Sequence, residues 1–319
     1  MLRSLPPIVV LGGCRLMRER EAYESVEILD KNGARIVNQM KEKRRGPAVM
    51  AISRNELLVV GGCSQEGVHL RSIEKLNLDT KKSEILGEIG QLKANRSEFR
   101  QNFGGKRCAA FCPLQDGRLF IAGGYDGISS ISNVCVVSQD GKFENFEPLP
   151  SELKNSAAVE VDGKVYLFGG WDGRRTLQSI VIYNIEGQKW DVCAGLKEPI
   201  ECHSATKIGR GIYIIGGFDS VMVVPSIYRF DLDSRTCEEL SSARLTQARE
   251  NHTTVAVETD DDKTLLVVIA GWNGREALDS VELFEVLPEE PWLQKVSENV
   301  VTSVPRNKAV ALTLPPGNR

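Results

Sequence analysis

Three histidines and eight cysteines are the side chains in this sequence with the clearest capacity for metal binding or nucleophilic chemistry. His69, His203 and His252 lack the helical spacing of a motif such as His-Glu-x-x-His, and no Cys-x-x-Cys pair occurs. No Gly-x-x-x-x-Gly-Lys loop is present to hold a nucleotide phosphate. The sequence therefore predicts a protein that is not an enzyme and needs no cofactor or metal.

Composition narrows the possible partners. The 319 residues carry 40 basic and 43 acidic side chains, a net charge of -3, so no overall positive field would attract nucleic acid or an anionic membrane. The longest apolar runs, such as residues 265–270, are far shorter than the ~20 residues of a membrane span. Eight cysteines are too few for a disulfide scaffold of this length, which favours reduced thiols. We expect a soluble, cytoplasmic protein that binds neither nucleic acid nor membrane.

The elements that position any functional group come from an internal repeat. A short apolar run that ends in two small residues occurs six times, at residues 8–13, 57–62, 119–124, 165–170, 212–217 and 265–271. The second glycines are 49, 62, 46, 47 and 54 residues apart, which indicates a repeat architecture. Runs rich in β-branched and aromatic residues and bounded by glycine predict strands that are buried on both faces.

Each run is flanked by further segments with the character of strands. Segments rich in small residues precede five of the runs, at 47–52, 108–112, 156–161, 204–208 and 253–257. After the glycine pair, Ser followed by Val or Ile opens a third strand in five repeats, and the third repeat has Asn133-Val134 there. Residues 142–146 and 188–191 are the clearest fourth strands. The pattern predicts six units of four strands.

The order apolar strand, Gly-Gly, aromatic-Asp-Gly, Ser-Val and late Trp190 resembles the kelch repeat over essentially the whole chain. The departures are Ala270 in place of a glycine, and Cys14 and Cys63 where an aromatic residue often follows the pair. The resemblance implies an all-β, six-bladed propeller with four antiparallel strands per blade, strand a innermost and strand d outermost. In kelch repeats the positions of His203 and His252 often carry a structural histidine, although a metal role for this pair stays open.

The two ends of the sequence suggest how the ring closes. The first repeat starts at its second strand, and residues 306–313 have the same form as residues 250–257. We expect the C-terminal segment to supply the inner strand of blade one. Residues 1–319 would then form a single domain.

Loops between strands b and c, and between strand d and the next strand a, should share one face of the propeller. Four b–c loops carry an aromatic residue, Tyr125, Trp171, Phe218 or Trp272, and two of these loops add Arg174, Arg175 and Arg275. Aromatic residues among polar ones are typical of interface anchors. The alternative is that these aromatic side chains only cover the rims of the blades.

Charged residues precede the inner strands. We expect Arg44, Lys106, Lys154, Glu201, Glu250 and Arg306 to ring one mouth of the central channel. In kelch proteins that act as substrate receptors, residues at this position contact a short peptide, so the resemblance implies a basic arc for an acidic peptide. The alternative is a set of solvated rim charges. Residues 91–106 form either a d–a loop over the same face or a disordered or weakly helical insertion.

The resemblance implies a protein-interaction module that recognises substrates for a cullin-RING ubiquitin ligase, as in BTB–BACK–kelch proteins. Arg3-Ser4-Leu5-Pro6-Pro7 resembles the junction that precedes the propeller in that family. BTB and BACK parts are not in this chain, so a BTB partner, or an N-terminal part of a longer product, would have to recruit the cullin. The main alternative is an actin-binding scaffold, and an enzyme is the third.

Overall fold

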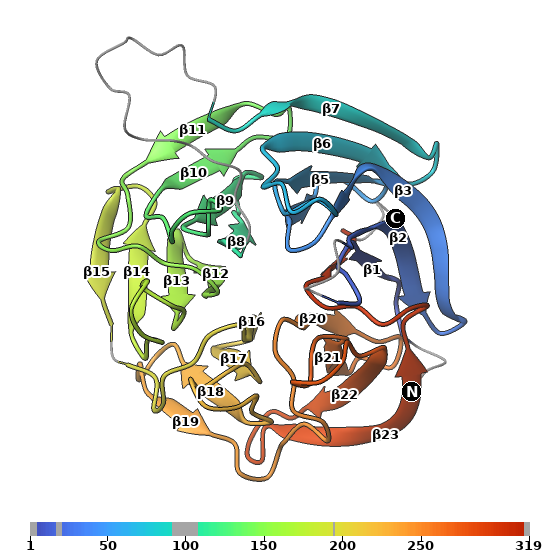
Figure 1. The fold of residues 1–319 in the computed structure, drawn as a ribbon. Coiled ribbons are helices and arrows are strands. Elements are labelled where there is room, and N and C mark those ends of the chain that lie inside the picture. Colours follow the sequence, from blue (N-terminus) through green and yellow to red (C-terminus); the bar gives the residue numbers. More distant parts are fainter. Residues whose placement is uncertain (1–4, 17–20, 91–107, 194, 316–319) are drawn as a thin grey trace.

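The computed structural model describes residues 5–16, 21–90, 108–193 and 195–315, and in these ranges all regular structure is β. Twenty-four strands form six four-stranded antiparallel sheets around a central axis (Figure 1). The six-bladed propeller and its strand order, expected from the repeat, are confirmed. No helix in these ranges is long and apolar enough to cross a bilayer.

The blades follow the chain in order, from the innermost strand to the outermost. Blade two is β4 (Ala48–Ala51), β5 (Glu56–Val60), β6 (Ser72–Asn77) and β7 (Lys82–Glu88). Blade three is β8 (Ala110–Pro113), β9 (Leu119–Ala122), β10 (Val134–Val137) and β11 (Phe143–Phe146). Blade four is β12 (Ala157–Val161), β13 (Lys164–Phe168), β14 (Ile180–Asn184) and β15 (Lys189–Val192). Blade five is β16 (Ser204–Ile208), β17 (Gly211–Ile215), β18 (Ile227–Asp231) and β19 (Cys237–Glu239). Blade six is β20 (Thr253–Glu258), β21 (Thr264–Ile269), β22 (Ser280–Val286) and β23 (Leu293–Val301).

Blade one is assembled from both ends of the chain. Its inner strand is β24 (Val310–Thr313), followed outward by β1 (Ile8–Leu11), β2 (Tyr23–Asp30) and β3 (Gly33–Arg44). β24 pairs with β1 in a register that sets Leu11 opposite Val310 and Ile8 opposite Thr313. The C-terminal strand thus closes the ring, as the sequence predicted.

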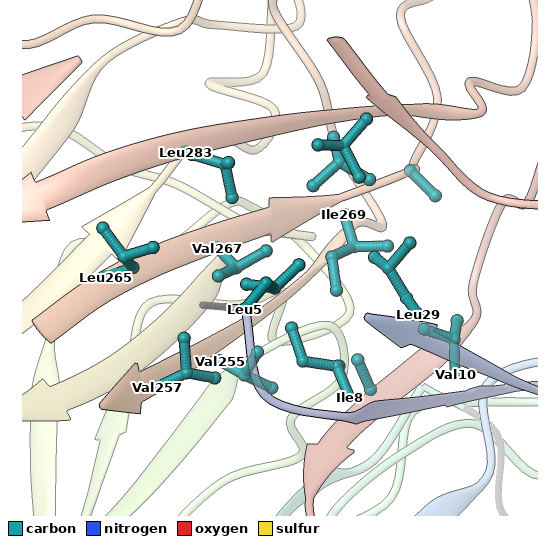
Figure 2. Close-up of a cluster of buried hydrophobic side chains, with 14 of the residues drawn as sticks. Leu5, Ile8, Val10, Leu29, Val255, Val257, Leu265, Val267, Ile269 and Leu283 are labelled. Atoms are coloured by element: carbon teal, nitrogen blue, oxygen red, sulfur yellow. The ribbon is translucent and has the colours of Figure 1, made fainter. Parts of the chain in front are cut away.

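The core lies between neighbouring blades because each sheet buries both faces. Between blades six and one, Leu5, Ile8, Val10 and Leu29 pack against residues of β20, β21 and β22 (Figure 2). The apolar runs of β1 and β21 are almost completely inaccessible to solvent. Burial on both faces explains why these strands are continuously apolar instead of alternating.

The glycine pairs end the second strand where no side chain fits. Gly123 has a φ of 63°, and a Cβ there would lie 2.1 Å from the carbonyl oxygen of Leu153. Ala270, the one departure from this pattern, takes the same left-handed conformation with φ of 59°. Blade six therefore keeps the turn with an alanine in it.

None of the eight cysteines, all of which lie within the described ranges, forms a disulfide in the structure. Cys14, Cys63, Cys112 and Cys135 are buried, and the other four are partly exposed. Burial raises the pKa of Cys237 to about 12 and raises the pKa of Cys14 as well. These thiols act mainly as small packing groups.

Candidate functional site

One turn recurs in four of the b–c loops. In each, the side-chain oxygen of an Asp or Asn accepts hydrogen bonds of 2.8–2.9 Å from the backbone N–H groups two and three residues ahead. The capping residues are Asp126, Asp172, Asp219 and Asn273. Burial acts to raise the pKa of Asp172, but the N–H donors of Arg175 and Arg174 outweigh it, so its pKa is lowered. Each tip is therefore held in one backbone shape.

The loop tips expose apolar and basic side chains. Ile128 is 85% exposed, and Val221 and Met222, at the corresponding tip of blade five, are 80% and 60% exposed. At the same tips of blades four and six stand the exposed Arg174, Arg175 and Arg275. The sequence pattern predicted these arginines at the surface but not the three apolar residues. An apolar pair two and three positions after a turn-capping Asp was the available signal.

The aromatic residue before each capping residue is half-buried. Trp171 exchanges two backbone hydrogen bonds with Lys154, at 3.0 and 2.8 Å, and Trp272 does the same with Glu250 at 2.9 and 2.8 Å. Phe218 and Glu201 form the third such pair. The backbone at these positions ties the b–c loop to the start of strand a, while part of each aromatic side chain stays at the surface.

Neighbouring loops touch, which makes the face continuous. His69, in the b–c loop of blade two, places Nδ1 2.8 Å from the carbonyl oxygen of Tyr125 in blade three, and the two rings lie 5.6 Å apart. The Nζ of Lys154, in blade four, lies 5.0 Å from the centre of the Tyr125 ring. We call the surface formed by the b–c loops and the starts of the inner strands the upper face.

The structure contradicts the expected positions of Arg44 and Arg306. Both side chains are completely buried, so neither rings the channel mouth. Arg306 donates to the carbonyl oxygen of Gly12 at 2.7 Å and to Ser25 Oγ at 2.9 Å, and its Nη2 lies 3.3 Å from Glu27 Oε2. Arg44 makes the equivalent contacts with Gly61, Ser72 and Glu74, the last at 2.9 Å. These arginines hold neighbouring blades together.

The expected positions of Arg44 and Arg306 differ from the observed ones by one residue. Asn307 pairs with Cys14, and Arg45 pairs with Cys63, in the way that Glu250 pairs with Trp272. Arg306 therefore corresponds to Arg249, which donates to the carbonyl oxygen of Ala270, to Ser280 and to Glu282. The motif is a buried Arg before strand a, paired with Ser-x-Glu at the start of strand c.

Charges that do face the mouth are mixed. Lys154 is half-buried, Glu201 is buried and hydrogen-bonded to Asn155 at 2.6 Å, and burial raises the pKa of the partly buried Glu250. Lys106 and the whole of the segment 91–107 lie outside the described residues. Among the described residues, the fully exposed arginines of the upper face that the sequence predicted therefore lie at the loop tips: Arg174, Arg175 and Arg275.

A cavity of about 120 Å³ lies in the channel below this mouth. Its lining includes His203 and His252, which burial keeps neutral by lowering their pKa values to about 4 and about 3. His252 Nε2 lies 2.8 Å from Ser204 Oγ. Across the described ranges, no three His, Cys, Asp or Glu side chains are grouped to hold a metal ion. The two histidines pack the inner strands.

Three segments match a family model described as the Kelch motif: residues 44–88, 153–197 and 200–244. They span the complete blades two, four and five. The comparison with curated proteins found no match. The three motif matches and the six four-stranded blades together support a kelch-repeat propeller.

Proposed function

We propose that residues 1–319 form a single kelch-repeat domain that binds a protein partner through its upper face. Kelch propellers in general fit a protein-interaction role. The observation that carries the proposal is the set of tips capped by Asp126, Asp172, Asp219 and Asn273, which present side chains on fixed backbones. A partner that binds such tips loses little additional conformational entropy on the side of the propeller.

The order in which basic and apolar loop tips follow one another around the propeller suggests the chemistry of the partner. Basic Arg174 and Arg175 in blade four, apolar Val221 and Met222 in blade five, and Arg275 in blade six stand at corresponding positions of consecutive blades. A peptide with a central apolar residue and a carboxylate on either side complements this order. Arginine suits the carboxylates because its guanidinium holds them with two parallel hydrogen bonds. The half-buried Trp171, Phe218, Trp272 and Tyr125 would add apolar contact area.

Within this role, we place the domain as the substrate-recognition part of a cullin-RING ubiquitin ligase complex in the cytoplasm. The support is the resemblance of the repeats to those of BTB–BACK–kelch proteins, and eight cysteines outside any disulfide suit a reducing compartment. A BTB-containing partner, or an additional part of a longer product, would contribute the link to the cullin.

The test is an affinity pull-down with quantitative mass spectrometry. The bait is the 319-residue chain, compared with Val221→Ser/Met222→Ser, with Arg174→Ser/Arg175→Ser, and with the control Ile36→Ser. Ile36 is 56% exposed on the outer strand β3, so it matches Met222 in exposure but lies away from the upper face. We expect both double variants to lose the same proteins at least tenfold, and the control to keep them.

Two further readouts separate the proposals. Retention of a partner should weaken as salt rises, because part of the binding is electrostatic. BTB proteins, cullins or ubiquitin-pathway proteins among the specific partners would support the ligase role, and co-sedimentation with actin filaments would replace it with the scaffold alternative. If all variants retain the partners equally, the binding site does not lie on the upper face.

A further inference from the structure

A lysine and a cysteine from two different blades meet at the mouth of the channel. Lys308 Nζ lies 2.9 Å from Cys108 Sγ, although the residues are 200 positions apart in the sequence. Lys308 precedes β24 of blade one and Cys108 precedes β8 of blade three, so the contact passes over blade two. Both side chains are partly exposed and line the channel cavity.

The backbone around this contact is fixed by a chain of hydrogen bonds. Two positions before its innermost strand, each blade has one residue in the left-handed conformation, with φ between 52° and 60°: Gly46, Cys108, Asn155, Cys202, Asn251 and Lys308. Five consecutive N–H···O bonds of 2.8–3.0 Å join them from Gly46 through Lys308, Asn251, Cys202 and Asn155 to Cys108. The lysine and the cysteine are therefore attached to a common, rigid ring.

Blade two leaves room for the lysine. At the blade-two position of the ring stands Gly46, and a Cβ placed on it would lie 4.0 Å from Lys308 Cδ. The alkyl chain of Lys308 passes over this glycine to reach Cys108. A larger side chain at position 46 would lie in the path of the lysine.

The neighbourhood favours reaction at Cys108 over the other ring cysteine. A lysine ammonium beside a thiol stabilises the thiolate, which is the form that peroxides oxidise. For Cys202, on the same ring, burial raises the pKa well above the ordinary value. The ring therefore holds one thiol next to an amine and one thiol that stays protonated.

We propose that Cys108 and Lys308 form a covalent Sγ–O–Nζ bridge when the protein meets hydrogen peroxide. In the first step, the Cys108 thiol and one peroxide give a sulfenic acid and one water, with a new S–O bond. In the second step, the Lys308 ammonium releases a proton to solvent, and the resulting amine, the sulfenic acid and a second peroxide give the bridge and two waters. One N–H bond, the sulfenic O–H bond and the peroxide O–O bond break, and an N–O bond forms. Sulfur and nitrogen each lose two electrons, and the two peroxides take up four.

The bridge would lock the closure of the ring. Lys308 lies two residues before β24, the strand that completes blade one. A covalent link from Lys308 to blade three would hold this strand in place even when β24 separates from β1. Oxidation would thereby change the stability of the propeller without adding a contact in its core.

Intact-mass and peptide mass spectrometry test the proposal on the purified 319-residue chain treated with hydrogen peroxide. The expected product gains about 14 Da, one oxygen added and two hydrogens lost, and joins tryptic peptides 108–118 and 307–319. The bridged protein should melt about 5 °C higher, because a link across a long loop restricts the unfolded chain. A thiol reductant should reverse both changes.

Matched variants distinguish the Cys108–Lys308 bridge from other oxidation products. Lys308→Arg and Cys108→Ser should lose the product, and Cys202→Ser should keep it. Sulfinic acid at Cys108, with a gain of about 32 Da, or a disulfide to Cys202, with a loss of about 2 Da, would overturn the proposal if formed in place of the bridge. The same 14 Da product in Lys308→Arg would overturn it as well. None of these outcomes depends on partner binding at the upper face.

Discussion

Arg306 and Glu27 form a completely buried ion pair across the junction of blades six and one, with Nη2 and Oε2 3.3 Å apart. The backbone carbonyl of Arg306 accepts a hydrogen bond of 2.8 Å from Gly271 N–H in blade six, while its side chain binds Gly12 and Ser25 in blade one. One residue thus connects the last blade to the first. Arg44 and Arg249 do the same at the junctions of blades one and two and of blades five and six.

Arg306→Ala is expected to lower the free energy of unfolding by about 3–5 kcal/mol, because it leaves the Glu27 carboxylate buried without its cationic partner. Urea denaturation followed by fluorescence measures this loss. Arg275→Ala is the control, since this exposed arginine should change stability by less than about 0.5 kcal/mol. Equal midpoints for the two variants would contradict a structural role for Arg306.

The same junctions suggest a paired replacement. In blades four and five the arginine position holds the buried Leu153 or Ile200, and the glutamate position holds Val181 or Tyr228. We expect Arg306→Leu/Glu27→Val to unfold at a higher urea concentration than Arg306→Leu alone, because the double variant removes both buried charges. A double variant whose loss equals or exceeds the sum of the single losses would show that the ion pair is not the coupled unit.

Stability should fall as the pH drops from 6.5 to 5. Burial lowers the pKa of His203 to about 4 and of His252 to about 3, whereas unfolded histidine titrates near pH 6.5. The unfolded state therefore binds more protons in this range, and each histidine removes about 2 kcal/mol of stability by pH 5. Glu250, whose pKa burial raises, acts in the opposite direction.

The slope of the unfolding free energy against pH, measured between pH 5 and 6.5, checks this. His203→Asn should reduce the slope by roughly half, whatever its effect at neutral pH. Asp231, with a pKa lowered to about 2 chiefly by the N–H of Ser234 against the opposing effect of burial, titrates far below this window. A slope that is the same in His203→Asn as in the unchanged protein would mean that His203 is solvated and protonated in the folded state at these pH values.

Deletion of residues 306–319 should abolish cooperative unfolding and promote aggregation. It removes β24, leaves the hydrogen-bonding edge of β1 unpaired, and removes the Arg306 contacts to blade one. Thermal unfolding and light scattering measure the two effects, with deletion of residues 316–319 as the control. A soluble 306–319 deletion that unfolds in one cooperative transition would contradict closure by the C-terminal strand.

Much of this fold could be predicted from the sequence because the strands and turns are specified by neighbouring residues. Apolar runs such as Ile212–Ile215 before Gly216-Gly217 predict buried strands and tight turns from the residues themselves, and six copies in order predict the ring. The likeness of residues 306–313 to residues 250–257 was enough to identify the closing strand. Tyr125, Trp171, Phe218 and Trp272 were assigned correctly to b–c loops, although their partner contacts remain predictions.

Tertiary contacts determined which charged side chains are buried and which are exposed. Arg306 is indistinguishable from a surface arginine in its local sequence, and only folding brings it to Glu27, 279 positions away, so that both charges can be buried together. Asn307, and not Arg306, lies opposite Cys14, so a shift of one residue in the register was enough to assign Arg306 to the wrong position. In the same way, Lys308 and Cys108 meet only because the ring places them on either side of Gly46. Periodicity determines the blades, whereas the pairing of distant side chains depends on the closed ring.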